Sequence, residues 1–109
     1  MKHPLLIAGS LIIASSLSVL GADAKANWDT HCAQCHGADG KADTKIGKQL
    51  NAKDLTDAKK QSEFTDAQAT EAIKNGIKEG SKVKMKAFGS KLSDDEVKAL
   101  VAYTRGLKK

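Results

Sequence analysis

Apolar residues recur at helical spacing in three parts of the chain. Trp28 and Cys32 stand four residues apart, so an opening helix would place the indole and the first thiol on one face. Residues 65–75 have a narrower apolar face, and the clearest stripe near the end of the chain consists of Val97, Leu100, Val101 and Thr104. No β-branched run alternates apolar and polar residues in the way a half-buried strand does. The pattern therefore predicts an all-α domain.

Capping residues mark the start of the second helix and of the third. Thr65 followed by Gln68 is a capping box, and the helix that it opens is predicted to end near Asn75, where Gly76 can adopt a positive φ. Ser93 and Glu96 form a second capping box. The helix after Ser93 is predicted to pack against the Trp28 helix and to end at Gly106.

The segments between these helices have weaker signals. Residues 37–40 read as a turn, residues 41–50 predict no regular element, and residues 55–60 predict at most a short helical turn. We expect the long connection to form a loop that wraps the functional site.

The first 24 residues have the pattern of a secretory signal. Lys2 gives a positively charged start, residues 5–20 form an apolar stretch, and Ala22-Asp23-Ala24 is a small-residue cleavage site. Cleavage after Ala26 is a second option, and an uncleaved anchor is the alternative, although the apolar stretch is short for a bilayer span. We expect a signal peptide at residues 1–24, export to the periplasm, and a soluble mature domain at residues 25–109.

The run Cys32-Ala33-Gln34-Cys35-His36 is a C-x-x-C-H sequence, the covalent attachment signature of c-type haem. Two thiols on one turn can each add across a haem vinyl group, and the next residue then presents an imidazole to the iron. The sequence therefore predicts one haem c, bonded through Cys32 and Cys35 and ligated by His36.

Other uses of the two cysteines fit the sequence less well. A thioredoxin-like dithiol needs a βαβ context, which the pattern lacks. A zinc site needs four converging ligands, and the other candidate after residue 24, His31, is crowded into the same short segment. A structural disulfide is what two cysteines would form in an oxidising compartment if haem did not take them.

Met85 is the leading candidate for the second axial ligand of the iron. It is the one methionine after residue 24, and it stands in a segment that we expect to be irregular, between the last two helices. A methionine that fills a gap in the core is the alternative, but the surrounding residues have no helical stripe. His31 is expected at the surface, because one short segment does not readily reach both faces of a haem. A lysine ligand is a minor alternative.

The chain resembles small monohaem class I cytochromes c over nearly all of residues 27–107. The segments that carry this resemblance are Cys32–Gly37, Ala72–Gly76, Met85–Gly89 and Leu92–Tyr103. It implies a small cytochrome c fold with crossed N- and C-terminal helices around one covalently attached haem. It also implies thioether links at Cys32 and Cys35, axial ligation by His36 and Met85, and one-electron transfer without substrate turnover.

Two positions depart from the family pattern, and both concern proline. Such cytochromes often have Met-Pro-Ala-Phe where this chain has Met85-Lys86-Ala87-Phe88, and Gly-Pro-x-Leu where it has residues 47–50. Without the prolines, we expect a looser loop around Met85. The carbonyl that accepts the Nδ1 proton of the proximal histidine, a bond that tunes ligand basicity, is left open.

The formal net charge of the chain is +5, and most of it is local. Between residues 74 and 91 the one acid is Glu79, against the lysines Lys74, Lys78, Lys82, Lys84, Lys86 and Lys91. Because this segment flanks Met85, we expect a basic rim that steers the protein onto acidic docking surfaces of redox proteins. The alternative is a solvated face without a preferred partner. We expect a monomer that binds no nucleic acid and, after signal cleavage, inserts into no membrane.

These features favour an electron carrier rather than an enzyme, with an iron that cycles between Fe(III) and Fe(II) in the periplasm. Two other functions stay open. One is a ligand-binding or peroxidatic haem protein with an open sixth coordination position. The other is a haem-bearing accessory subunit of an oxidoreductase complex.

Overall fold

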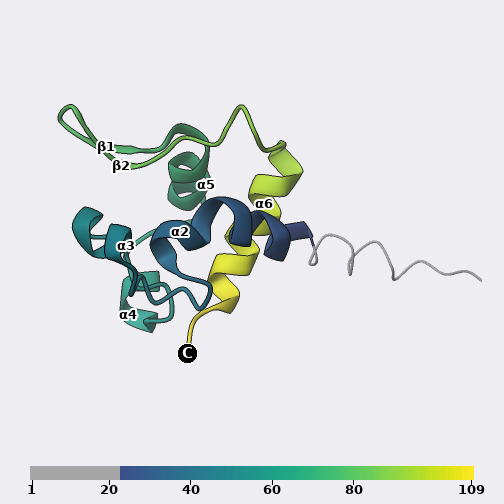
Figure 1. Cartoon of the computed structure of the whole chain (residues 1–109). Coiled ribbons are helices and arrows are strands. Elements are labelled where there is room, and N and C mark those ends of the chain that lie inside the picture. Colours follow the sequence, from purple (N-terminus) through teal and green to yellow (C-terminus); the bar gives the residue numbers. More distant parts are fainter. Residues whose placement is uncertain (1–22) are drawn as a thin grey trace, which may run out of the picture.

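The computed structural model describes residues 23–109, so the predicted signal segment lies outside the described residues except for Asp23 and Ala24. Helices dominate, as the apolar pattern predicted, and one small antiparallel sheet joins them (Figure 1). In chain order the elements are η1 (Trp28–Cys32), α2 (Ala33–His36), α3 (Lys45–Leu50), α4 (Ala58–Gln61), α5 (Asp66–Asn75), β1 (Ile77–Glu79), β2 (Lys82–Met85) and α6 (Asp94–Gly106). Within residues 23–109, no helix has the length and apolar character needed to cross a membrane.

The N-terminal helix widens into a π-helical turn just before the first cysteine. The backbone N–H of Ala33 bonds to the carbonyl of Trp28, five residues back. Trp28, with 2% of its surface exposed, and Cys32 are both buried, as their spacing predicted. The indole Nε1 of Trp28 donates to the carbonyl of Gly37 over 3.0 Å. Trp28 thereby ties the helix to the residue that follows His36.

Helix α6 crosses this N-terminal helix (Figure 1). Its predicted capping box is present: Glu96 N donates to Ser93 Oγ, and Ser93 N donates to Glu96 Oε1. The Trp28 and Tyr103 rings lie 5.4 Å apart between centroids, and Asn27 Nδ2 donates to Glu96 Oε2 over 3.1 Å. The predicted stripe of Val97, Leu100, Val101 and Thr104 is buried. The crossed terminal helices are therefore confirmed.

Helix α5 also begins and ends as predicted. The Thr65–Gln68 capping box is present in both directions, and Gly76 follows the helix with φ 77°. A Cβ at Gly76 would lie 2.6 Å from the carbonyl oxygen of Met85. A glycine is needed here both for the positive φ and for the close approach of the segment that carries Met85.

Helix α3 lies in a segment for which we predicted no element. The Thr44 hydroxyl caps it by accepting from Gly47 N at 2.9 Å, and the same hydroxyl donates to the Cys35 carbonyl at 2.7 Å. A Cβ at Gly47 would lie 2.3 Å from that carbonyl oxygen. Helix α3 packs through backbone contact rather than through an apolar stripe, which is why the pattern of side chains does not show it.

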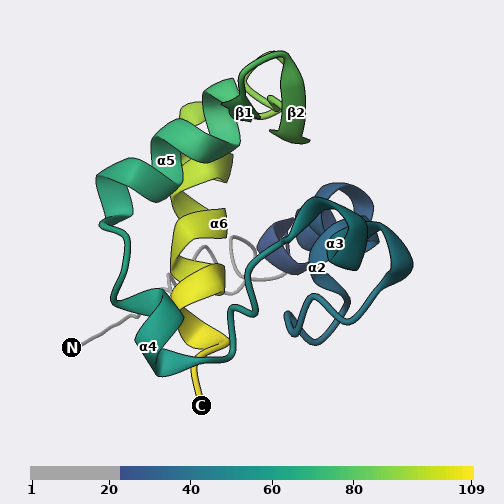
Figure 2. The ribbon, with the colours of Figure 1, turned by 90° about the vertical axis from the view of Figure 1, so that its left-hand side faces the viewer.

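The segment around Met85 is a β-hairpin, not the irregular stretch that we expected. Strands β1 and β2 pair antiparallel, with Ile77 opposite Met85, Lys78 opposite Val83 and a bulge between Ile77 and Lys78. Figure 2 shows the hairpin at the end of α5, away from α4. Ile77 and Val83 are exposed and Met85, at the end of β2, is half-buried, so the strands have no continuous buried face.

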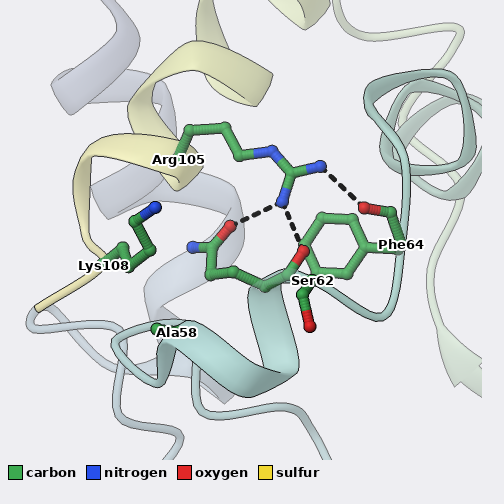
Figure 3. Close-up of a pocket in the computed structure, with 6 residues that line it drawn as sticks. Ala58, Ser62, Phe64, Arg105 and Lys108 are labelled. Carbon is green, nitrogen blue, oxygen red and sulfur yellow. Dashed lines mark hydrogen bonds between the residues drawn. The ribbon is translucent and has the colours of Figure 1, made fainter.

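Arg105 of α6 fixes the segment between α4 and α5 (Figure 3). Its guanidinium donates to the Gln61 carbonyl and side-chain oxygens at 2.6 and 2.8 Å, and to the Phe64 carbonyl at 2.7 Å. It also lies over the Phe64 ring, 4.4 Å from the centroid. The buried Gln61 amide donates in turn to the carbonyls of Leu55 and Thr104. This network joins three parts of the chain and was not predicted from the sequence.

Candidate functional site

The two cysteines lie three residues apart, where η1 passes into α2, and are both free thiols. Cys32 is buried in the apolar core, whereas Cys35 is half-buried. Burial, and secondarily the neighbouring Cys35, raises the pKa of the Cys32 thiol to about 11. A neutral thiol in apolar surroundings is a poor redox nucleophile. Among residues 23–109, no group of three or more His, Cys, Asp and Glu side chains is placed to hold a metal ion.

The imidazole of His36 is oriented by the backbone of Lys53. Its Nδ1 lies 3.0 Å from the Lys53 carbonyl oxygen. Because a carbonyl only accepts, Nδ1 carries the proton and Nε2 has the free lone pair. Burial lowers the pKa of His36, partly offset by the bond to Lys53, and so favours the neutral imidazole that binds iron. The acceptor that the sequence left open is thus the Lys53 carbonyl.

The backbone of the C-x-x-C-H run is held by the loop that follows it. The Cys35 carbonyl accepts from the Thr44 hydroxyl, and the His36 carbonyl accepts from Ala42 N at 2.8 Å. The His36 ring lies 5.8 Å from the Trp28 ring between centroids. These contacts between parts of the chain hold the backbone of the two cysteines and the imidazole in place relative to one another.

Met85 ends strand β2 and is half-buried against the apolar core that contains Cys32. Just beyond it, Phe88 N donates to the Ile73 carbonyl at 2.8 Å, and Gly89 N donates to the Lys74 carbonyl at 3.0 Å. These two bonds fasten the segment to the end of α5. Backbone bonds therefore anchor this loop where the family often has a proline, and its looseness stays a prediction.

His31 does not have the surface position that we expected. It is half-buried, and its ring lies 5.2 Å from the Phe88 ring between centroids. Phe88 is itself part of the core, next to the segment that carries Met85. His31 thus packs between the N-terminal helix and this segment.

The lysines of the predicted basic rim have different surroundings. Lys74 Nζ lies 2.6 Å from Asp94 Oδ1, so this cation joins α5 to α6. Lys78, Lys82 and Lys84 are on the hairpin, and Lys86 and Lys91 are exposed beyond it. The charge available to a partner is therefore concentrated on and after the hairpin.

Comparisons with known proteins show the family of this chain. Residues 20–103 match the protein family described as cytochrome C oxidase, cbb3-type, subunit III. A solved structure named KustC0563 c-type cytochrome is 39% identical, covers 80% of this chain and 99% of that chain, and superposes with a TM-score of 0.71. The chain belongs to the c-type cytochromes. A tyrosine-to-phenylalanine mutant of Kustc0563 is similar to this c-type cytochrome at 38% identity, over 79% of this chain and 99% of that one, with a TM-score of 0.68. No curated protein matches.

Membership of the c-type cytochromes implies covalently bound haem c, and the residues of this chain fit that group. Cys32 and Cys35 are free and close in the helix, and among residues 23–109 no side chain or backbone group hydrogen-bonds to His36 Nε2. The apolar core beside Cys32 suits a large apolar ring. The mostly helical fold, with its one small sheet, is of the expected kind.

Proposed function

We propose that this c-type cytochrome is a one-electron carrier, with haem c bonded to Cys32 and Cys35 and ligated by His36 and Met85. The observation that carries the proposal is the bond from His36 Nδ1 to the Lys53 carbonyl, because it turns Nε2 into the available ligand atom. Haem c supplies the Fe(III)/Fe(II) couple. The side chains and backbone of this chain hold the ligands, exclude water and bind the partner.

The surrounding residues support a carrier that changes little between its two redox states. The Lys53 carbonyl holds the imidazole, and the bonds of Phe88 and Gly89 to α5 hold the segment of Met85. A thioether is a neutral ligand, and a Met/His ligand pair raises the reduction potential. Trp28 and Phe88, both buried, keep water from this side of the core. The fixed ligand set favours electron transfer over binding of an external ligand.

The partner and the compartment belong to the same proposal. The lysines on and after the hairpin are suited to acidic docking surfaces, since complementary charge raises the rate of encounter. The periplasm is proposed from the secretory pattern of residues 1–24. In this view the mature protein is an electron shuttle, not an enzyme.

The visible absorption spectrum of the purified holoprotein tests the ligand set. We expect low-spin c-type bands in both redox states, together with the weak red charge-transfer band of a ferric thioether bond. A reversible titration with one electron per haem completes the test. A high-spin spectrum, or carbon monoxide binding by the native ferrous protein, would instead support a ligand-binding or peroxidatic function.

An accessory subunit of an oxidase is the second candidate, and the description of the matching family favours it. The similar solved structure named KustC0563 c-type cytochrome instead favours a carrier. Purification from the native source through high salt separates the two. Loss of all partners supports the shuttle, and a stable complex with other oxidase chains supports the subunit.

A further inference from the structure

Gln61 of α4 is a buried polar residue, and each polar atom of its side-chain amide is bonded. The side chain belongs to a residue only 4% exposed, and its Nε2 donates to the carbonyls of Leu55 and Thr104 at 2.7 and 2.8 Å. Its Oε1 accepts from Arg105 Nη1 at 2.8 Å (Figure 3). Because a guanidinium only donates and a carbonyl only accepts, one orientation of the amide satisfies all three partners. The amide is therefore fixed, and it fixes the Leu55 carbonyl.

Leu55 lies two residues after Lys53, whose carbonyl oxygen is 3.0 Å from His36 Nδ1. Leu55 N donates to the Gly40 carbonyl at 2.8 Å, and the Leu55 carbonyl accepts from Gln61. Gly40 belongs to the turn that follows the C-x-x-C-H run. The backbone just after the Lys53 carbonyl is thus tied to the attachment segment on one side and to the buried amide on the other.

Other contacts of this segment act beside Leu55 or at the surface. The Asp54 carboxylate accepts from Thr56 N and Oγ1 at 2.9 and 2.6 Å, which closes the turn, and Lys109 N donates to the Thr56 carbonyl. The Lys53 ammonium lies 3.4 Å from Glu63, and both side chains are about half exposed. An exposed ion pair of this kind stabilises little. Among these contacts, the buried brace on the carbonyl side of Leu55 is the amide.

We propose that Gln61 is a positioning residue for the proximal imidazole of His36. Through the Leu55 carbonyl it holds the Lys53 carbonyl at its hydrogen bond to Nδ1, and Arg105 holds the Gln61 amide in turn. The inference rests on the proposed function, because it takes His36 as the iron ligand. A hydrogen-bonded Nδ1–H makes the imidazole a more basic ligand, and a more basic ligand favours Fe(III). The brace from α4 and α6 therefore lowers the reduction potential.

The reduction potential of the Gln61→Met holoprotein tests this role. Methionine has a similar length and no charge, but it donates no hydrogen bond to the Leu55 carbonyl. We expect the bond to Nδ1 to weaken and the Fe(III)/Fe(II) equilibrium to move about threefold toward Fe(II). An unchanged equilibrium would overturn the proposal. So would a move toward Fe(III), which is the effect of water entering a loosened core.

Two control variants separate positioning from loss of stability. Val97→Ala removes buried volume from α6, where Val97 is 0% exposed, and lowers the free energy of unfolding without removing a bond of the network. Gln49→Met makes the same substitution at an exposed position of α3. Both should keep the potential of the parent. If Val97→Ala moves the equilibrium as far as Gln61→Met does, the proposal is overturned.

Nuclear magnetic resonance of the reduced holoprotein reads the imidazole bond directly. We expect the His36 Nδ1 proton to exchange with deuterated water about tenfold faster in Gln61→Met than in the parent. Arg105→Lys keeps the amide and removes its guanidinium partner, so it should change the exchange rate and the potential less, in the same directions. If Gln61→Met does not fold, Arg105→Lys decides alone. Parent-like exchange and potential in the folded variants would overturn the proposal.

The same spectra separate this inference from the proposed function. The ring protons of a histidine bound to ferrous haem are shifted strongly upfield by the porphyrin ring current. If the His36 ring protons of the parent have no such shift, His36 is not the ligand, and the proposed function fails. If they have it, and the Gln61→Met potential equals that of the parent, only the positioning role fails.

Discussion

His36 Nδ1 lies 3.0 Å from the carbonyl oxygen of Lys53, so the proximal imidazole is oriented by main chain from the far end of the α3 loop. A side-chain acceptor could be lost by one substitution, whereas a carbonyl persists whatever residue stands at position 53. The orientation of the imidazole therefore depends on the path of the backbone between α3 and α4. Residues that hold this path matter more than the side chain of Lys53.

Replacing Met85 with alanine should open the sixth coordination position. The thioether is lost, and Phe88 and Gly89 remain fastened to α5 by their backbone bonds, so the segment is held in place without supplying a new ligand. We expect the ferrous variant to bind carbon monoxide and the ferric variant to lack the red thioether band. Val83→Ala, on the same strand, is the control and should behave as the parent does. Carbon monoxide binding by Met85→Ala no different from the parent would contradict Met85 ligation.

Replacing Gly47 with alanine should destabilise the holoprotein by about 2 kcal/mol, as overpacking against backbone does. The new Cβ would lie 2.3 Å from the Cys35 carbonyl oxygen, so α3 or the attachment helix must move. Gly106→Ala is the matched control, because a Cβ there meets nothing within 4 Å. Denaturant unfolding of the three proteins gives the comparison. Equal free energies of unfolding for both variants would show that α3 does not rest on the attachment segment.

Replacing Arg105 with lysine should cost about 2 kcal/mol, because an ammonium does not reproduce the planar fork that serves Gln61 and Phe64. Asp66→Asn is the control for charge, because it removes the ion pair between Arg105 and Asp66. The Asp66 side chain is 72% exposed. An exposed pair contributes less than about 0.5 kcal/mol. Thermal unfolding of both variants distinguishes the effects. A larger loss in Asp66→Asn would mean that the ion pair, not the carbonyl contacts, holds the α4–α5 segment.

Acid should weaken the start of α6 through Glu96. Its pKa is held below the usual value of 4.5, chiefly by the backbone N–H of Ser93 and then by the Asn27 amide. A lowered folded-state pKa stabilises the protein above the unfolded-state pKa, and this contribution is lost as pH falls through the folded-state value. We therefore expect Glu96→Gln to lose less stability than the parent between about pH 6 and about pH 3. Glu79→Gln, on the exposed hairpin, serves as the comparison. An identical acid loss in the parent and Glu96→Gln would exclude this role.

Helices with capping boxes and a buried stripe could be predicted from the sequence, because both signals are local. Thr65 and Ser93 bond to residues three positions on, and the stripe of α6 follows from helical spacing alone. The C-x-x-C-H run likewise predicts its attachment chemistry within five residues. The helices are confirmed and haem c fits the family, whereas attachment at Cys32 and Cys35 and axial ligation by His36 and Met85 stay predictions.

The missed features depend on contacts between distant segments. Helix α3 is stabilised by Gly47 against Cys35, and no pattern within residues 41–50 contains that contact. The bond from His36 to the Lys53 carbonyl and the bonds of the Arg105 guanidinium join residues far apart in the sequence. No local sequence pattern predicts them. The hairpin was missed for a different reason: residues 82–86 alternate lysine with Val83 and Met85, but this short run has one β-branched residue, and Val83 is exposed, so it lacks the signal of a half-buried strand.

Trp28 is the one tryptophan of the chain, and its ring lies 5.8 Å from that of His36. A porphyrin bound at such a position accepts excitation energy from the indole, so a folded, loaded molecule should be nearly dark in fluorescence. An unloaded or unfolded chain should emit. The contact that ties the attachment helix to Gly37 thus equips the protein with an intrinsic optical reporter of its own maturation.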